Sequence, residues 1–218
     1  ALGSLASTNY SFSFATGALT ITKKQLTVTA DAASRVYGAA DPTFTATITG
    51  FANSQTLGTS DVTGSPSFST NASASSAVGG SYAITPALGS LTSTNYSFSF
   101  ANGALTVTKK SLTVTANNAS RGFNSADPTF TATITGFANS ETLGTSGVTG
   151  AASFSTTATA LSALGTYPIT PAVGTLSAVN YSFGSMVAGV LTITQGTQTI
   201  TFAALPQHAL SEGSFALT

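Results

Sequence analysis

The sequence has no cysteine and no tryptophan, and it contains one histidine and one methionine. Without cysteine there is no disulfide framework, and thiols give no indication of the redox compartment. The single histidine, His208, lies outside the repeated part of the chain, so no serine–histidine hydrolase site recurs along it. Charged residues make up 6% of the chain, against roughly 25% in an ordinary soluble domain. Six basic residues do not form the footprint that nucleic-acid binding requires.

Other chemical signals are also missing. No run of 18 apolar residues is present, so the sequence predicts no membrane-spanning helix. A phosphate-binding glycine-rich fingerprint is absent. Of the carboxylates only Asp41 recurs, as Asp127, because Asn117 replaces Asp31 and Glu141 stands where the first copy has Gln55. We therefore expect neither an enzyme nor a bound metal or cofactor.

What the sequence does contain is a repeat with a period of 86 residues. The pair Lys23-Lys24 recurs as Lys109-Lys110, and residues 43–54 (TFTATITGFANS) return unchanged at 129–140. A period of this length indicates a row of modules, each folding as a unit. Whatever one module does, the chain does more than once.

Each module carries a strong strand signal, in which apolar residues alternate with Ser or Thr. The clearest runs are residues 26–30, 44–49, 96–100 and 105–108. Alternation with a period of two predicts half-buried strands. Turn signals every 8–15 residues favour six or seven strands per module. The predicted fold class is all-β, with tandem Ig-like β-sandwich modules arranged as an elongated rod; a β-grasp-like topology would show similar alternation.

Two local predictions accompany this fold. Asn102-Gly103 separates two strand patterns, so residues 98–108 are expected to form a hairpin. Residues 55–62 are compatible with one short helical turn.

The repeat predicts four parts of the chain. Residues 1–24 nearly duplicate 87–110 and are expected to be the C-terminal strands of a preceding module. Residues 25–110 and 111–195 are the two whole repeats. Residues 196–218 are expected to begin a further Ig-like module, with a strand over 197–202.

The connection between the repeats is short, since only residues 109–111 lie between two strand patterns. There is no Gly/Ser-rich linker, and we therefore predict a semi-rigid rod. Two roles are open for the repeated charges near this junction: fixing the angle between modules, or keeping strand ends soluble. The predicted junction residues are Lys23, Lys24, Arg35, Asp41, Lys109, Lys110, Arg121 and Asp127.

Most aromatic residues fall on the apolar phase of a strand, which predicts core packing. Phe51 and Phe137 differ, because each ends a strand near a loop. We predict these two rings, with Asn53 and Asn139, as exposed contacts.

An ordered set of motifs adds to this interpretation. It comprises Tyr37-Gly38, Asp41-Pro42 followed by Phe44, Thr-Gly-Phe-Ala-Asn at 49–53, Gly-x-Tyr-x-Ile-Thr at 80–85, Gly-x-Leu-x-x-x-Asn-Tyr at 89–96 and Gly-x-Leu-Thr-Val-Thr-Lys at 103–109. This set resembles the MBG-type repeats of large bacterial surface proteins and adhesins, sometimes described as mucin-binding-like. The resemblance covers about residues 1–195, although Phe123-Asn124 replaces Tyr-Gly in the second copy. It implies secretion, tandem arrays and a role at the bacterial cell surface.

Three functions compete at this point. The first is a structural stalk or fibre segment whose partners are neighbouring modules of the same chain. The second is a filament subunit that uses strand complementation with identical chains, since the apolar side chains of residues 1–24 need cover. The third is a module that binds surface glycans or mucin. The first explains near-identical copies and the short junction, and we expect it.

Overall fold

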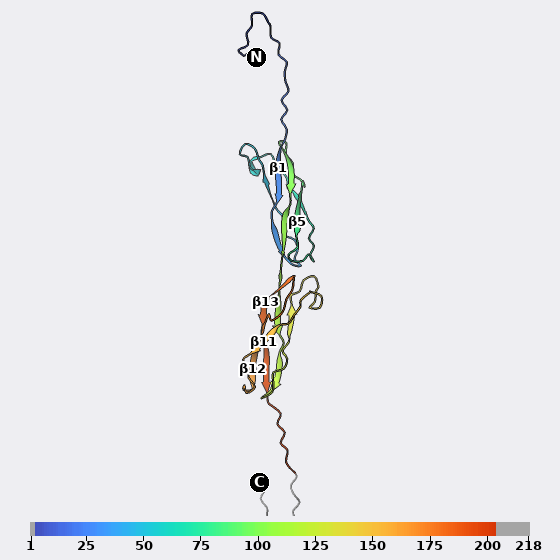
Figure 1. The fold of residues 1–218 in the computed structure, drawn as a ribbon, viewed down its shortest axis with the longest axis vertical. Coiled ribbons are helices and arrows are strands. Elements are labelled where there is room, and N and C mark those ends of the chain that lie inside the picture. The colour runs from blue at the N-terminus through green and yellow to red at the C-terminus, as the bar shows by residue number, and fades with distance from the viewer. Residues whose placement is uncertain (1–2, 204–218) are drawn as a thin grey trace, which may run out of the picture. The chain divides into compact units, whose positions relative to one another are not determined.

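The computed structural model describes residues 3–203, and the boundary between its two compact units falls between Lys110 and Ser111 (Figure 1). The described part of each unit has seven strands. Those of the first unit are β1 (Lys24–Ala30), β2 (Ala33–Val36), β3 (Ala46–Thr49), β4 (Ser67–Thr70), β5 (Tyr82–Ala87), β6 (Tyr96–Ala101) and β7 (Gly103–Thr108). Those of the second are β8 (Lys110–Ala116), β9 (Ala119–Gly122), β10 (Ala132–Thr135), β11 (Ser153–Thr156), β12 (Gly165–Ala172), β13 (Tyr181–Val187) and β14 (Gly189–Thr194).

The first unit is a sandwich of two sheets. One sheet has the order β3-β1-β6, and the other has the order β2-β7-β5-β4. In each sheet an opening strand lies parallel to a closing strand: β1 pairs with β6, and β2 pairs with β7. The other pairings, β1 with β3, β5 with β7 and β4 with β5, are antiparallel. The all-β sandwich prediction is confirmed.

The core lies between the two sheets and follows from the alternation in the sequence. On β1, Leu26 and Val28 are fully buried, whereas Thr27 between them is half-buried on the outer face. Ala30, at the end of the same strand, packs with Ile84 and Leu105 of the opposite sheet. Burying a Leu, Ile or Val side chain contributes about 1.5–3 kcal/mol each. The apolar phase of each strand therefore determines which face turns inward.

The second unit repeats this arrangement. Its sheets have the orders β10-β8-β13 and β11-β12-β14-β9. Leu112 and Val114 on β8 are fully buried, as are their counterparts on β1. Ile169 and Leu191 join Ala116 in a cluster equivalent to that around Ile84. Both copies thus bury the same repeated positions.

The predicted hairpin over residues 98–108 is wrong. β6 and β7 belong to different sheets, and Asn102-Gly103 carries the chain from one sheet to the other. A Cβ atom on Gly103 would lie 2.4 Å from the carbonyl oxygen of Ala30, so the residue allows two backbones to approach closely. Gly189 has the same role in the second unit, where the distance to the Ala116 oxygen would be 2.5 Å.

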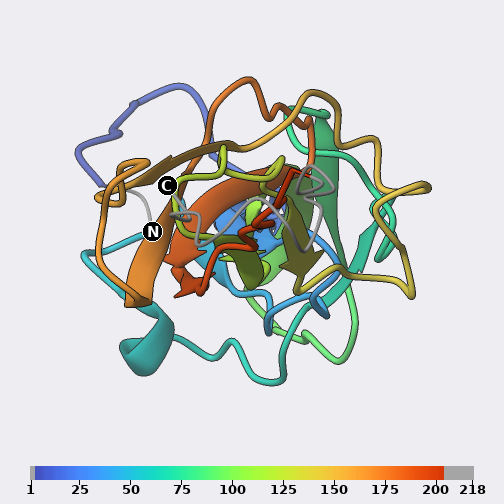
Figure 2. The same ribbon diagram turned by 90° about the horizontal axis from the view of Figure 1, so that it is seen from below.

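The expected short turn within residues 55–62 is present as a single 3-10 turn, η1 (Leu57–Thr59). It is the coiled teal segment at the lower left of Figure 2, outside the strands. The Thr56 backbone N–H donates to the Thr59 hydroxyl at 2.8 Å, which closes the turn. The equivalent loop of the second unit has the same contact between Thr142 and Thr145, at 2.9 Å.

Two segments next to the sandwiches have strand-like sequences and form no strand within the described residues. Residues 3–23 and 195–203 pair with no other strand, so the strand predicted over 197–202 is not formed. A strand needs a partner for its backbone N–H and C=O groups, and neither segment has one here. The remainder of the predicted terminal parts, residues 1–2 and 204–218, lies outside the described residues.

Candidate functional site

A buried cation organises one end of the first unit. Arg35 on β2 is 6% exposed. Its Nε lies 2.7 Å from Asp41 Oδ1 and forms an ion pair with it. The Nε–H group does not point at this oxygen, so the contact is not a hydrogen bond. One terminal nitrogen donates to the Ala39 carbonyl at 3.1 Å, and the other donates to the Ser73 carbonyl. Because a buried charge must be paired and hydrogen-bonded, the guanidinium holds two loops to β2, one at residues 39–41 and one at Ser73.

The second unit has the same arrangement. Arg121 on β9 donates from Nε to Asp127 Oδ1 at 2.5 Å and from a terminal nitrogen to the Thr159 carbonyl at 2.6 Å. A further bond, at 3.3 Å, goes to the Gly122 carbonyl. The planar guanidinium of arginine can donate several hydrogen bonds in different directions at once, as this site requires. The compact ammonium group of lysine could not make the same set of contacts.

These observations place four of the predicted junction residues. Arg35 pairs with Asp41 and Arg121 pairs with Asp127, and these ion pairs join residues of one unit. In each unit the arginine also donates to the carbonyl of a loop residue far away in the sequence, Ser73 or Thr159. A role in setting the angle between modules stays a prediction.

The four lysines lie at strand starts. Lys24 begins β1 and Lys110 begins β8, while Lys109 is the single residue between β7 and β8. Lys23 precedes β1, and its Nζ donates to the Ser93 carbonyl at 2.7 Å. The side chains of Lys23, Lys24 and Lys109 are exposed, and Lys110 is half-buried.

The rings predicted as exposed contacts are half-buried instead. Phe51 packs edge-on against Tyr96, with ring centroids 5.6 Å apart, and Phe137 packs in the same way against Tyr181. An edge-to-face aromatic pair is favourable beyond the area it buries, which draws the ring toward the core. Asn53 is exposed as predicted, at a φ of 52° that asparagine tolerates better than most residues. Asn139 has the same exposure and the same φ.

The buried tyrosines also hold the loop that follows these rings. The Tyr96 hydroxyl accepts from the Ala52 backbone N–H at 3.1 Å and donates to Gln55 Oε1. In the second unit, the Tyr181 hydroxyl accepts from Ala138 at 3.0 Å and donates to Glu141 Oε2 at 2.6 Å. The only substantial chemical difference is that a carboxylate replaces an amide.

Two carboxyl groups of the first unit are held by hydroxyls and amides. The Thr45 and Thr47 hydroxyls donate to Asp31 at 2.6 and 2.8 Å, and they lower the pKa of its carboxyl. The Ser93 hydroxyl donates to Asp61 at 2.7 Å and lowers the pKa of Asp61, against a smaller opposing effect of burial.

The second unit has neither carboxyl. Asn117 replaces Asp31 and keeps the geometry with neutral groups: its amide donates to Thr131 at 2.9 Å, and its oxygen accepts from Thr133 at 2.8 Å. Gly147 replaces Asp61. The negative charges of Asp31 and Asp61 are therefore specific to the first unit and are not a common feature of the two modules.

Among the cavities on the described surfaces, one in each unit differs clearly in chemistry from the other. The first, of about 400 Å³, belongs to the first unit and lies between the start of β1 and the loops near Tyr96. Amide, ammonium and hydroxyl groups dominate its lining. The residues that line it are Ile21, Thr22, Lys23, Lys24, Ala52, Asn53, Gln55, Thr94, Asn95 and Tyr96.

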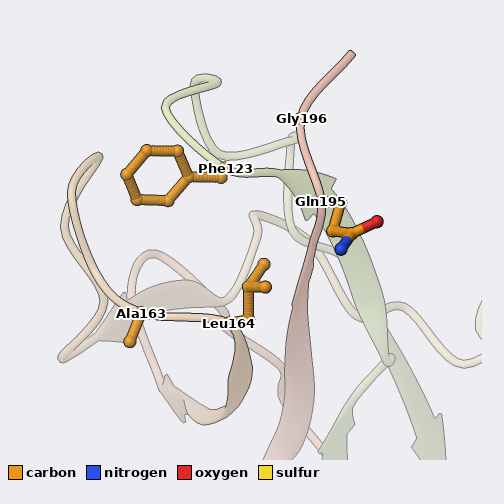
Figure 3. Close-up of a pocket in the computed structure, with 5 residues that line it drawn as sticks. All are labelled: Phe123, Ala163, Leu164, Gln195 and Gly196. Atoms are coloured by element: carbon orange, nitrogen blue, oxygen red, sulfur yellow. The ribbon is translucent and has the colours of Figure 1, made fainter. Parts of the chain in front are cut away.

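The second cavity is apolar and belongs to the second unit. It measures about 660 Å³ and is lined by Phe123, Ala163, Leu164, Gln195 and Gly196. Figure 3 shows the Phe123 ring above Ala163 and Leu164, with the segment that contains Gln195 and Gly196 beside them. Phe123 is 43% exposed and Leu164 is 53% exposed. Large apolar side chains gathered at an opening are a contact surface, since water solvates them poorly.

Within residues 3–203, no group of three or more histidine, cysteine, aspartate or glutamate residues lies together. No helix among these residues is long and apolar enough to cross a bilayer.

The same modules appear in a comparison with known families. The model of the MBG domain (YGX type) matches residues 26–106 and 112–192. The chain belongs to the MBG domain family. Comparison with curated proteins gave no match. MBG repeats are typical of bacterial surface proteins, and their presence here suggests a repeat module of the surface adhesin type.

The Tyr-Gly signature of the MBG domain has a backbone explanation here. Gly38 has a φ of 78°, in the left-handed region that favours glycine, directly after β2 and Tyr37. The second copy has Asn124 at that position with a φ of 58°. Asparagine enters this region more readily than most residues, so Phe123-Asn124 preserves the turn while changing the motif.

Some features of the MBG modules were not recognised from the sequence. The burial of Arg35 and Arg121 was missed, because arginine is mostly exposed in proteins. The sequence does contain one sign of a shared structural role, because each arginine recurs with an aspartate six residues later. The tyrosine contacts with Gln55 and Glu141 carried no sequence signal, since the partners lie about 40 residues away.

Proposed function

We propose that this chain is a structural segment of a secreted bacterial surface protein, serving as a stalk or fibre and having no catalytic role. The proposal rests on one observation: opening strands run parallel to closing strands, β1 with β6 and β2 with β7 in the first MBG module and β9 with β14 in the second. The register joins Lys24 to Tyr96 at one end of the first unit and Val36 to Thr108 at the other. The chain therefore enters the module at one end and leaves at the opposite end.

This arrangement resists tension along the chain. A pull on the residues before β1 and after β7 draws parallel neighbours past each other, so that their hydrogen bonds are loaded together. Six residue pairs join β1 to β6 and four join β2 to β7. Such a geometry suits a spacer that carries force between a cell and a surface.

The connection between modules supports the same proposal. β7 ends at Thr108 and β8 begins at Lys110, which leaves only Lys109 between the two strands. A flexible spacer would need several Gly- or Ser-rich residues at this point. We propose that the joint has little freedom and that modules in series set the reach of the protein.

Stretching single molecules of the full chain tests the proposed stalk. We expect two unfolding events, each releasing roughly 280 Å of chain. Ser99→Pro in edge strand β6 should lower the unfolding force of one event. Ser69→Pro in edge strand β4 is the matched control and should leave the force nearly unchanged, because β4 is not in a parallel pair. Equal effects of the two variants would reject the shear geometry and, with it, the proposed function.

A glycan-binding module is the second candidate, and the polar cavity of the first unit favours it. Asn53, Gln55 and Asn95 line this cavity, and side-chain amides are suited to sugar hydroxyls. A glycan array probed with the full chain, with Asn53→Ala and Asn95→Ala as variants, distinguishes the candidates. Selective binding lost in these variants would establish the second candidate, and an array without signal would reject it.

A further inference from the structure

Asn102 is the only asparagine of the chain that is followed by glycine; the others precede serine, alanine, tyrosine or a second asparagine. Asparagine is one of the chemically labile residues of proteins. Its side-chain amide is open to attack by the backbone nitrogen of the next residue, and a side chain on that residue hinders the attack. Glycine hinders it least, because it has no Cβ and the widest choice of backbone conformations. Asn102-Gly103 is therefore the position of this chain most susceptible to loss of an amide.

The reaction at such a position needs only water. The Gly103 nitrogen forms a bond to Asn102 Cγ and the Cγ–Nδ2 bond breaks, so that Nδ2 leaves as ammonia with the proton of the Gly103 nitrogen. Water then opens the resulting cyclic imide at one of its two carbonyl carbons. Attack at Cγ gives aspartate. Attack at the main-chain carbonyl carbon gives isoaspartate, in which the main chain passes through Cβ and Cγ and is longer by one methylene group.

Asn102-Gly103 lies at a crowded point of the fold. It carries the chain from β6 to β7, and so from one sheet of the first unit to the other. Asn102 is exposed, whereas Gly103 is half-buried. A Cβ atom on Gly103 would lie 2.9 Å from the Ala30 carbonyl carbon and 2.9 Å from the Asp31 carbonyl oxygen. The crossover therefore has room for neither a side chain nor additional main-chain atoms.

The folded unit withholds the attacking nitrogen. Gly103 lies opposite Ile84 in the antiparallel ladder between β5 and β7. The Ala83 N–H donates to Asn71 Oδ1 at 3.0 Å, and Asn71 follows β4 on the other side of β5, so Ala83 faces away from β7. Because neighbouring residues of a strand alternate in direction, Ile84 turns its backbone groups toward Gly103 and engages its N–H. The reaction therefore requires this end of the ladder to open.

We propose that Asn102-Gly103 is a spontaneous modification site, at which opening of the first unit leads to isoaspartate and prevents that unit from closing again. The added methylene group lengthens the main chain between β6 and β7 by about 1.5 Å. Since the backbone of Ala30 leaves no room at Gly103, the extra length shifts β7 along its neighbours. Leu105 and Val107, each 2% exposed, then leave their positions in the core.

The second unit has the same crossover without the reactive amide. Ala188-Gly189 stands one repeat after Asn102-Gly103. A Cβ atom on Gly189 would lie 2.5 Å from the Ala116 carbonyl oxygen, so the backbones approach each other as closely as in the first unit. Alanine has no side-chain carbonyl carbon for the Gly189 nitrogen to attack. The two units thus share the steric constraint and differ in the chemistry. The modification does not depend on the stalk function, since it needs only the chain and water.

Incubation of the full chain at pH 8, with and without urea, tests the site. Mass spectrometry of proteolytic fragments follows the change from amide to acid at each asparagine, and a methyltransferase specific for isoaspartate identifies the product. We expect conversion of Asn102 to be at least tenfold faster in urea than in the folded chain. In urea it should also be at least tenfold faster than conversion of Asn53, which precedes serine. An Asn102 that stays unchanged in urea, or that converts equally fast in the folded chain, would overturn the proposal.

Removing the urea afterwards tests the consequence for the fold. Hydrogen exchange should show a refolded first unit only in the molecules without isoaspartate, whereas the second unit should refold in all of them. Asn102→Ala copies the second unit and is the matched control, since both of its units should refold after the same incubation. A modified first unit that refolds as well as that of Asn102→Ala would overturn the proposal.

The added charge is separated from the added length by a further variant. Asn102→Asp, used without prior incubation, carries the carboxylate on a main chain of normal length, and its first unit should refold. Failure of this variant to refold would assign the effect to the charge and would equally overturn the proposed role of the methylene group.

Discussion

The Arg35 guanidinium lies 2.7 Å from the Asp41 carboxylate, and the arginine side chain is almost fully buried whereas the aspartate is about one-third exposed. The cation is thus shielded from water on every side except that of its partner. Arg121 and Asp127 repeat this asymmetry in the second unit. Two copies of one ion pair in one chain allow each to serve as the control for the other.

Removing the partly exposed partner tests the contribution of this pair. Asp41→Ala should lower the free energy of unfolding of the first unit by about 1–3 kcal/mol. This is less than for a fully buried pair, since water screens the aspartate. Hydrogen exchange in urea, followed by mass spectrometry, reports each unit separately. Lys24→Ala, which removes an exposed charge from the same unit, should change stability by less than about 0.5 kcal/mol. Equal effects would show that the pair does not organise the unit.

The glycine between β6 and β7 provides a second prediction. Gly103→Ala should destabilise the first unit by about 1–3 kcal/mol, because the added Cβ meets the Ala30 carbonyl oxygen. Gly58→Ala is the matched control, since a Cβ at that position meets nothing within 4 Å. The same hydrogen-exchange measurement applies. A Gly103→Ala chain as stable as Gly58→Ala would mean that the two backbones separate at little cost.

The tyrosine hydroxyl of the second unit is a third target. Tyr181→Phe removes the acceptor of the Ala138 N–H and the donor to Glu141, and leaves the buried N–H without this partner. We expect a loss of about 1–3 kcal/mol. Tyr10→Phe, at an exposed ring that precedes β1, should have no effect on this unit. A double-mutant cycle with Glu141→Ala separates the two bonds, and a coupling energy near zero would show that Glu141 contributes nothing through this hydroxyl.

The two units should respond differently to acid. Hydrogen bonds lower the pKa of Asp31 and Asp61 in the folded first unit below the ordinary value of 3.8. Both carboxylates therefore stabilise that unit above pH 3.8, and this stabilisation is lost as the pH falls through the folded pKa values.

The second unit has Asn117 and Gly147 at these positions and should show a smaller loss over the same range. Chemical denaturation at pH 6 and at pH 2.5, followed by hydrogen exchange, compares the units in one sample. Asp31→Asn with Asp61→Asn should remove most of the difference. Parallel acid profiles for the two wild-type units would contradict the prediction.

The parts of the fold that follow from local patterning were predictable. Alternation placed Leu26, Val28 and Leu105 in the core, and the repeat placed their counterparts in the second unit. Which strands pair with each other was harder to predict from the sequence. Asn102-Gly103 has the local signature of a hairpin, whereas its glycine is needed for a contact with Ala30, more than 70 residues earlier.

The candidate site was predicted less well, for a related reason. Phe51 ends a strand near a loop, which suggested exposure, and only the position of Tyr96 in space shows why its ring turns inward. The sequence marked Arg35 and Asp41 as a repeated pair without indicating burial, because burial depends on the Ser73 loop that covers the guanidinium. Contacts between distant segments were beyond what residue spacing can indicate.

The passage of β1 into β2, and of β6 into β7, means that each of these continuous runs contributes to both sheets. Neither layer can be peeled away while the other stays intact, since both share the same two stretches of backbone. We therefore expect the two sheets of a module to unfold together. A protease at the cell surface would then meet either a closed module or a fully denatured one, so resistance to digestion depends on the global stability of each repeat rather than on its weakest edge.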